Sequence, residues 1–193
     1  MIVVFDLELT AWPGSAERNW SAPGEHPEII QIGAVRLDEN LDEVAAVDLA
    51  VKPRLNPILS DYIKDLTGIT QERIDGEGID LGDALARLAA LADGAHALCC
   101  NGGDAQWIDR NVTLAGIANP LAGALFVNVS PHFRRATGRG THVVSSSLPE
   151  VFGFSDTGRA HDGLADARAI AEALRRTLPR KSPSTLIAIL ESP

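Results

Sequence analysis

The chain has 193 residues, of which 45% are hydrophobic and 22% are charged. These proportions are typical of one globular domain with a sizeable core, and they exclude a disordered or low-complexity chain. The net charge of −9 argues mildly against a nucleic-acid partner, because surfaces that bind phosphate groups are usually basic.

The N-terminus and the cysteines indicate a cellular compartment. No run of about 18 apolar residues occurs, so we expect no transmembrane helix and no membrane partner. The opening segment MIVVFDLELT has neither a basic region nor a small-residue cleavage site, so we expect no signal peptide and a cytoplasmic location. The adjacent Cys99 and Cys100 exclude a disulfide framework and are expected to be thiols in a short buried strand.

The first part of the chain is expected to form three strands. Residues 2–6 are a continuous apolar run that ends in an acid, as in a central buried strand. Residues 13–27 are rich in Pro, Gly, Ser and Glu and are expected to be a loop. Residues 28–38 and 44–52 are the second and third expected strands. Because short links join these strands, we expect an antiparallel meander.

Helices and strands then alternate. In chain order we expect a helix at 81–92, a strand at 96–100, a helix at 104–116, a strand at 124–129 and an amphipathic helix at 162–178. Ser147-x-x-Glu150 has the spacing of a capping box before a further short helix. The predicted fold class is α/β, with a mixed five-stranded sheet in which an antiparallel meander precedes parallel strands, flanked by helices.

Asp6 and Glu8 are the first candidates for chemistry. Residues i and i+2 of a strand point to the same face, so both carboxylates are expected side by side. Like charges at that distance repel unless a cation lies between them, and hard oxygen ligands suit Mg²⁺ or Mn²⁺. By itself Asp-x-Glu is a weak signal, because any exposed strand can contain it.

The segment His161-Asp-Gly-Leu-Ala-Asp166 lies at the start of the last predicted helix. This spacing places His161 on the preceding loop and Asp166 one turn into the helix, where a carboxylate and a general base can share one space. The alternative is purely structural. Asp162 would be an N-cap, Asp166 a first-turn acid favoured by the helix dipole, and His161 a loop residue.

The third signal is Asn101-Gly-Gly-Asp104, after the fourth expected strand. Because Asp104 follows a strand and a glycine turn, its carboxylate is expected to lie near the ends of the strands, as those of Asp6 and Glu8 do. Asp109 is the rival candidate, and it is otherwise interpreted as a solvent-facing helix charge. Asp104 is favoured because Trp107 and Ile108 then face inward from the same helix.

Together these motifs resemble the DEDDh 3′→5′ exonuclease family, the DnaQ-like enzymes with a ribonuclease-H-like fold. The segment Glu28–Val35 is similar to the family's second strand. Three further segments look like the subgroup of histone-mRNA 3′-exonucleases and bacterial KapD-like proteins, namely Leu55–Ser60, Leu66–Gln71 and Gly158–His161. The resemblance implies an exonuclease domain over residues 1–178.

The same resemblance implies a two-metal mechanism. The metal ligands would be Asp6, Glu8, Asp104 and Asp166, holding two divalent cations, Mg²⁺ or Mn²⁺. His161 would be the general base that takes a proton from the attacking water. The expected reaction removes nucleoside 5′-monophosphates from the 3′ end of single-stranded RNA or DNA.

The resemblance also implies residues near the terminal nucleotide, which are Leu9, Thr10, Trp12, Leu66 and Thr67. Trp12 has an alternative interpretation as a partly buried loop anchor. Two departures from the subgroup occur. Leu9 precedes Thr10 where the subgroup usually has Ala, and Gly103 precedes Asp104 where it usually has an aromatic residue.

Residues 179–193 are expected to be a C-terminal extension docked on the domain. The segment Pro179–Pro183 breaks the preceding helix, and Leu186–Leu190 is an apolar run that is alternatively a dimer contact. Two other functions stay open. One is an oligonucleotide-specific phosphodiesterase, favoured by the acidic composition, and the other is a catalytically silent regulatory protein on the same fold. The pattern decides neither RNA against DNA nor the oligomeric state.

Overall fold

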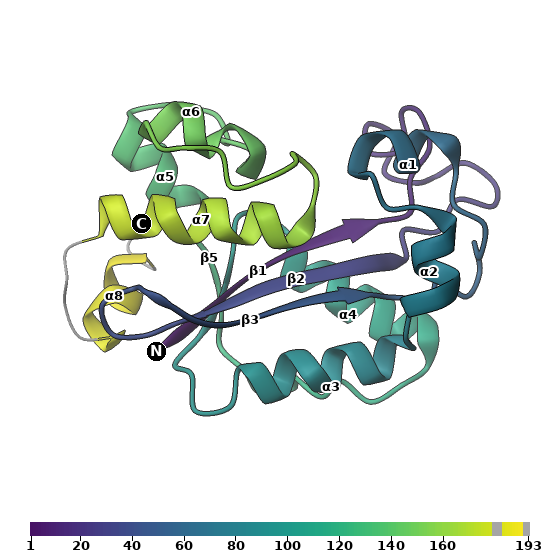
Figure 1. Ribbon diagram of the computed structural model, residues 1–193, viewed down its shortest axis with the longest axis horizontal. Coiled ribbons are helices and arrows are strands. Elements are labelled where there is room, and N and C mark those ends of the chain that lie inside the picture. The colour runs from purple at the N-terminus through teal and green to yellow at the C-terminus, as the bar shows by residue number, and fades with distance from the viewer. Residues whose placement is uncertain (179–182, 191–193) are drawn as a thin grey trace.

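The computed structural model describes residues 1–178 and 183–190 and contains a five-stranded sheet in the order β3-β2-β1-β4-β5 (Figure 1). The strands are β1 (Ile2–Leu9), β2 (Ile29–Leu37), β3 (Glu43–Ala50), β4 (Leu98–Cys100) and β5 (Phe126–Asn128). β1 pairs with β2 and β2 with β3 in antiparallel fashion, whereas β1–β4 and β4–β5 are parallel. The predicted mixed sheet, a meander followed by parallel strands, is confirmed.

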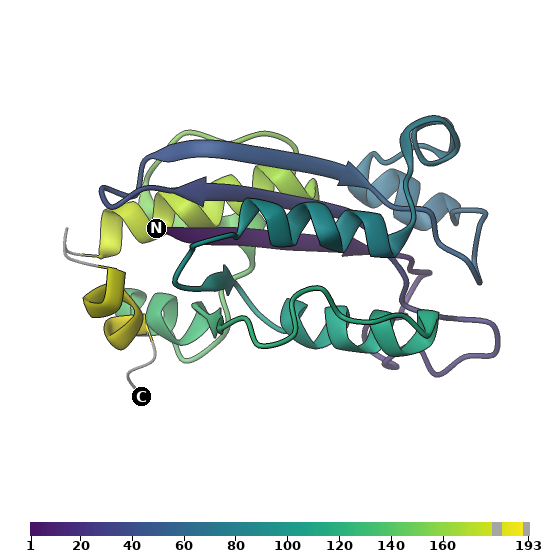
Figure 2. The same cartoon turned by 90° about the horizontal axis from the view of Figure 1, so that it is seen from below.

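Helices cover both faces of this sheet (Figures 1 and 2). One face packs against α5 (Ser130–Thr137), α6 (Leu148–Phe152) and the long helix α7 (Gly163–Thr177). The other face packs against α3 (Leu81–Leu91) and α4 (Asp104–Ala115). Cys99 belongs to the first core cluster and Cys100 to the second, as expected for neighbours in a strand. Burial raises the pKa of both thiols to about 12, so they are poor metal ligands at neutral pH.

Two short helices that the sequence did not predict stand beside the end of the sheet. They are α1 (Asp61–Thr67) and α2 (Gln71–Glu77). Ile63 of α1 and Ile74 of α2 pack on Ile30 in a third, smaller hydrophobic cluster. In Figure 1 these helices lie next to the arrowhead of β1, across from the N-terminus of α7.

Two local expectations need correction. β1 continues to Leu9, beyond the expected end at residue 6, so Glu8 lies inside the strand. The capping box at Ser147 is also absent. A 3-10 turn, η1 (Ser145–Ser147), leads directly into α6, and Ser147 itself has helical angles (φ −94°, ψ −8°) with no side-chain cap. A residue already in the helical region cannot act as a conventional N-cap.

The last described element is α8 (Pro183–Leu190). Leu190 is buried, and Ile187 and Ile189 pack against the same core cluster as α7. Residues 179–182 and 191–193 of the predicted extension lie outside the described residues. The division of the chain at residue 178 therefore stays a prediction. Across the two described ranges, no helix has the length and apolar character needed to cross a membrane.

Candidate active site

Asp6 and Glu8 point to the face of β1 that packs against α7. Across the antiparallel pair, Asp6 lies opposite Gly33 and Glu8 opposite Gln31 of β2. The register shifts immediately after Glu8, a β-bulge of the kind that often re-aims side chains beside active sites. Two carboxylates from one strand are thus placed side by side, as their spacing predicts.

Asp104 is the first residue of α4, and its carboxylate reaches the same space. Its charge raises the pKa of both Asp6 and Glu8, which shows that the three acids are neighbours. The rival Asp109 is exposed and accepts a hydrogen bond from Asn119 Nδ2 at 3.2 Å. Of the two candidates, the structure brings Asp104 to the strand ends.

The N-terminus of α7 lies directly on β2. A Cβ atom on Gly33 would lie only 2.0 Å from the carbonyl carbon of Gly163, so only glycine permits this approach. The Gly163 N–H donates to Gln31 Oε1 at 2.8 Å, and Asp162 caps the helix by accepting from the Ala165 N–H at 2.9 Å. The predicted cap and the predicted site therefore coexist, and Asp166 is carried to the β1 carboxylates.

His161 completes the cluster from the loop before α7. Its backbone is left-handed (φ 59°), a region that non-glycine residues seldom occupy and that is frequent at functional sites. Its N–H donates to Asp166 Oδ2 at 3.1 Å. One ligand atom from each of Glu8, His161 and Asp166 lies within 4.8 Å of the other two. Partial burial lowers the pKa of the imidazole.

All four carboxylates have raised pKa values, and burial is the largest cause in each case. Glu8 is raised to about 9, with repulsion from Asp166 and Asp104 as the next causes. Asp166 is raised to about 7 and Asp104 to about 6, while Asp6 is raised well above its ordinary value. A cluster that resists ionisation in this way is stabilised by a divalent cation, which attracts every member at once.

The sequence did not single out the residues that support this cluster. Ser145 Oγ donates to Asp6 Oδ1 at 3.4 Å, and Asn101 Nδ2 donates to Ser145 Oγ at 3.2 Å. Gln31 joins β2 to α7, because its amide nitrogen donates to Asp48 and Asp162 while its oxygen accepts from Gly163. The sequence signal for Gln31 was a polar residue between Ile30 and Ile32, within the segment Glu28–Val35 that is similar to the family's second strand.

The five predicted substrate residues fall into two groups. Leu9, Trp12 and Leu66 are partly exposed. Thr10 and Thr67 are buried, and their hydroxyls are used inside the protein. Thr10 Oγ1 donates to the His26 carbonyl and accepts from the Glu28 N–H, and Thr67 Oγ1 donates to the Ile63 carbonyl at 2.8 Å. These two threonines shape the backbone around the site.

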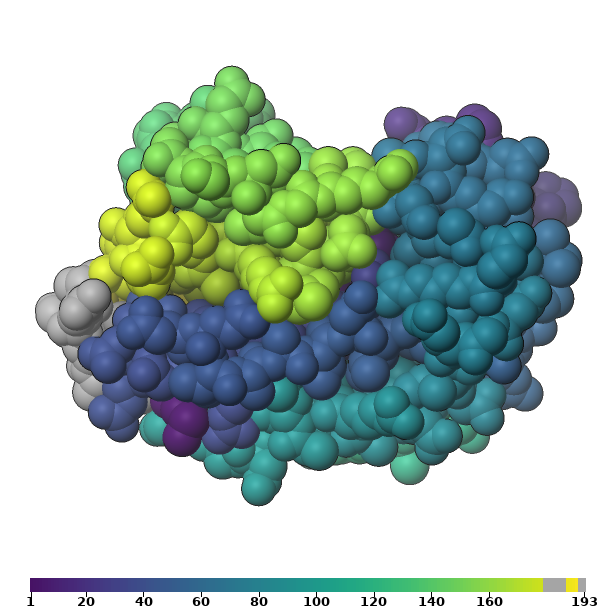
Figure 3. Space-filling view, viewed as in Figure 1, coloured from purple at the N-terminus to yellow at the C-terminus, as the bar shows by residue number. Residues whose placement is uncertain are grey.

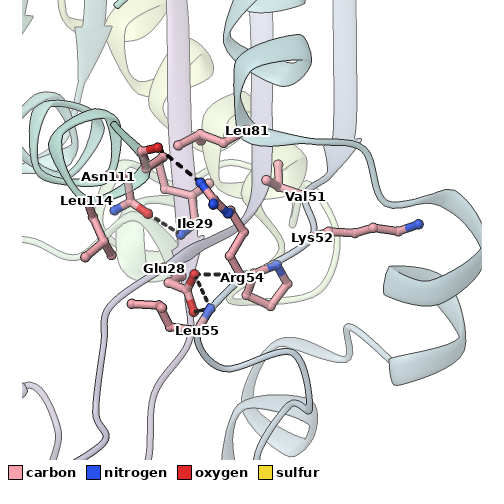
Figure 4. Close-up of a pocket in the computed structure, with 11 residues that line it drawn as sticks. Glu28, Ile29, Val51, Lys52, Arg54, Leu55, Leu81, Asn111 and Leu114 are labelled. Carbon is pink, nitrogen blue, oxygen red and sulfur yellow. Dashed lines mark hydrogen bonds between the residues drawn. The ribbon is translucent and has the colours of Figure 1, made fainter. Parts of the chain in front are cut away.

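The loop before α1 is fixed by the buried Glu28, which precedes β2. Its carboxylate accepts the N–H groups of Arg54, Leu55 and Asn56 at 2.6–3.0 Å (Figure 4). Asn111 of α4 holds the start of β2 in the same view. The small pocket between them, about 80 Å³, is lined by none of the predicted catalytic residues. It therefore belongs to the scaffold that places the loop.

Comparison with known proteins identifies the family. A model of the Exonuclease family (RNase T) matches residues 3–174. This chain belongs to that exonuclease family. The expected family is thereby confirmed.

Individual relatives are more distant. The mouse (Mus musculus) ERI1 exoribonuclease 2 is 24% identical over 226 residues, covering 96% of this chain but 32% of that protein. The 3′-5′ exonuclease crn-4 of Caenorhabditis elegans is 25% identical over 207 residues, covering 98% and 66%. This exonuclease-family chain thus spans about a third of the length of the first of these relatives.

Solved structures agree on the fold. The nuclease domain of 3′hExo, a DEDDh family member bound to rAMP, superposes with a TM-score of 0.76 at 23% identity, covering 91% of this chain and 90% of that domain. The structure of cell-death related nuclease 4 (CRN-4) gives a TM-score of 0.71 at 22% identity, covering 91% and 62%. The predicted ribonuclease-H-like fold is confirmed.

Proposed function

We propose that this chain is a divalent-metal-dependent 3′→5′ exonuclease that releases nucleoside 5′-monophosphates from single-stranded RNA or DNA. The observation that carries the proposal is the convergence of four acids and one histidine, drawn from β1, α4 and the start of α7, within an exonuclease-family fold.

Asp6, Glu8, Asp104 and Asp166 are the proposed ligands of two Mg²⁺ or Mn²⁺ ions. The donor set suits these ions, because hard cations prefer carboxylate oxygens and because burial and mutual repulsion raise the pKa of all four acids. When bound, such ions supply an acidified water and stabilise the charge on the phosphoryl oxygens.

His161 is the proposed general base. Its lowered pKa keeps the imidazole neutral near pH 7, which is the form that accepts a proton from water. The hydrogen bond from its own N–H to Asp166 keeps the ring close to the acids. A ring nitrogen of His161 lies within 4.8 Å of carboxylate oxygens of Glu8 and Asp166, so the side chain lies beside the cluster.

Leu9, Trp12 and Leu66 are the proposed contacts of the terminal nucleotide. Their partial exposure leaves apolar surface for a base, and stacking on an aromatic side chain contributes about 1–3 kcal/mol. We assign Thr10 and Thr67 a supporting part, since their hydroxyls hold the neighbouring backbone.

A second candidate, a phosphodiesterase restricted to very short oligonucleotides, is favoured by the net charge of −9. Long polyanions are repelled by an acidic protein, whereas a dinucleotide carries little charge. A catalytically silent protein on the same fold is disfavoured, because all five proposed catalytic residues are present and adjacent.

The deciding experiment measures mononucleotide release in Mn²⁺ from three substrates: a 5′-labelled long single strand, a dinucleotide and a circular single strand. The proposal expects a ladder that shortens from the 3′ end, no cleavage of circles, and no reaction in EDTA. Hydrolysis of the dinucleotide alone would establish the second candidate. Cleavage of the circle would show an endonuclease. If no substrate released mononucleotides, the chain would be a catalytically silent protein on the same fold.

A further inference from the structure

Charge is distributed unevenly along this acidic chain. The chain contains 26 acidic residues, yet none lies between Asp109 and Glu150. The same stretch contains four arginines and two histidines. The negative charge therefore belongs to the remainder of the chain, and residues 110–149 form a basic segment within it.

Three exposed side chains of this segment form what we call the basic rim: Arg134, Arg139 and His142. The charge of Arg134 contributes to lowering the pKa of His142, so the two side chains are neighbours. His142 Nδ1 lies 2.6 Å from Ser130 Oγ, which ties the loop to the start of α5.

Among the described residues, the guanidinium groups of the two arginines of the basic rim have no polar partner, unlike those of the arginines of α7. Within residues 1–178 and 183–190, the guanidinium groups of Arg134 and Arg139 make no hydrogen bond or ion pair, whereas Arg168, Arg175 and Arg176 all pair with glutamates. An unpaired guanidinium offers five N–H donors to a phosphate, in a geometry that permits bidentate binding.

The basic rim leads directly to the acid cluster. The Val143 carbonyl accepts from Asn101 Nδ2 at 2.9 Å, and Ser145 Oγ donates to Asp6. His142 precedes Ser145 by three residues, so at most about 10 Å of chain separates their Cα atoms. In Figure 3 a narrow opening lies between the yellow-green segment around the start of α7 and the blue segment that contains α1, with purple atoms visible inside it.

We propose that the basic rim binds the phosphodiester backbone of the substrate strand, upstream of its 3′-terminal nucleotide. This inference rests on the proposed function and extends it. Neutralising phosphates with arginine provides most of the affinity for a single strand, and the rim supplies that charge beside the acids of a chain with net charge −9. A dinucleotide, whose one phosphodiester lies among the carboxylates, has no phosphate left for the rim.

The test compares Arg134→Ala, Arg139→Ala and the double variant with wild type. Affinity for a long fluorescent single strand is measured by anisotropy in EDTA over a range of salt concentrations. We expect the Kd of the double variant to rise about tenfold at low salt. The slope of log Kd against log salt should fall by about 0.7 for each phosphate that the variant no longer neutralises. In Mn²⁺, the preference for the long strand over a dinucleotide, as a ratio of KM values, should fall by a similar factor.

Arg87→Ala is the matched control, because Arg87 is an exposed arginine on α3, which covers the opposite face of the sheet. It removes the same charge, and its salt slope should equal that of wild type. Two results would overturn the proposal that the basic rim binds the strand. One is an unchanged slope of log Kd against log salt in the double variant, and the other is an equal loss of affinity in Arg87→Ala. A wild-type protein that binds the strand through the rim but never hydrolyses it would instead refute the proposed function.

Discussion

Gly163 approaches Gly33 so closely that a Cβ atom on Gly33 would lie 2.0 Å from the Gly163 carbonyl carbon. Gly33 lies opposite Asp6 in the sheet, and Asp166 follows Gly163 by three residues on α7. The distance between β2 and α7 at this point therefore determines how far Asp166 lies from the carboxylates of β1. One glycine contact sets the width of the acid cluster.

Gly33→Ala should separate α7 from the sheet. Overpacking at such a position costs about 1–3 kcal/mol, and displacing a catalytic group by 1 Å lowers turnover by about 10²-fold. Thermal unfolding and mononucleotide release measure the two effects. Gly76→Ala is the control, because nothing lies within 4 Å of a Cβ atom at Gly76 in α2, and alanine should stabilise that helix by about 0.5–1 kcal/mol. Wild-type Tm and activity in Gly33→Ala would contradict this account.

The sequence predicted all five strands and the long helices, but it did not predict α1 and α2. The apolar runs of β1 and β2 and the amphipathic pattern of α7 are local signals, and each was recognisable from a few turns or residues. α1 and α2 have seven residues each, too few for a periodic pattern. They depend on caps from Ser60 and Thr70 and on packing against Ile30, and that packing is not visible in sequence.

The same limit applies to the site. Asp6 and Glu8 follow from the two-residue period of a strand, and Asp166 from its place in a helix entry. Ser145 and Gln31 could not be predicted, because their partners Asp6 and Gly163 are 139 and 132 residues away along the chain. Whether Asp6, Glu8, Asp104, His161 and Asp166 are catalytic is a prediction that the following variants test.

Asp6→Asn and Asp166→Asn should each lower Mn²⁺-dependent turnover by at least about 10²-fold, because each removes a charged ligand from a site that stabilises phosphoryl charge. EDTA should abolish wild-type activity. Asp109→Asn is the control, since this exposed acid lies on the same helix as Asp104 but outside the cluster. Hydrolysis at the wild-type rate in the Asp6→Asn protein would remove the metal site from the mechanism.

The metal-free protein should lose stability as the pH rises. Glu8, Asp104 and Asp166 have folded-state pKa values of about 9, 6 and 7, all above their ordinary values of 4.5, 3.8 and 3.8. The folded state therefore binds more protons than the unfolded state. The stabilisation is fully present below the ordinary pKa values and is lost as the pH passes through the raised ones. We therefore expect the free energy of unfolding to fall from mildly acidic pH to about pH 9.

Glu8→Gln tests this linkage. At pH 8 the ionised Glu8 of the unfolded chain has to take up a proton on folding, and Gln removes that cost. The substitution should therefore raise the metal-free Tm at pH 8, by about 2–4 °C for each kcal/mol gained. The gain should largely disappear at pH 4, where Glu8 is protonated in most of the unfolded chains as well as in the folded protein. Thermal unfolding in EDTA across this range is the measurement. A Tm for Glu8→Gln below that of wild type at pH 8 would show that the acid cluster is not strained.

His161→Ala separates a general base from a metal ligand. Loss of a base should lower turnover by about 10²–10⁴-fold. The wild-type rate should rise with pH through a limb below the ordinary histidine pKa of about 6.5, since burial lowers the pKa of this imidazole. That limb should be missing from the residual activity of the variant, because the group that titrates has been removed. His96→Ala, which removes an exposed histidine, should keep both rate and limb.

Calorimetry with Mn²⁺ measures whether His161 contributes to metal binding. His161 lies within 4.8 Å of ligand atoms of Glu8 and Asp166, so the geometry alone permits a metal ligand as well as a base. A base that makes no metal contact leaves Mn²⁺ affinity nearly unchanged in His161→Ala, whereas loss of a ligand weakens it strongly. A merely structural histidine would lower Tm and keep the pH limb. A folded His161→Ala protein that binds Mn²⁺ and cuts at the wild-type rate would exclude His161 as the base, because the proton of the attacking water would then have another acceptor.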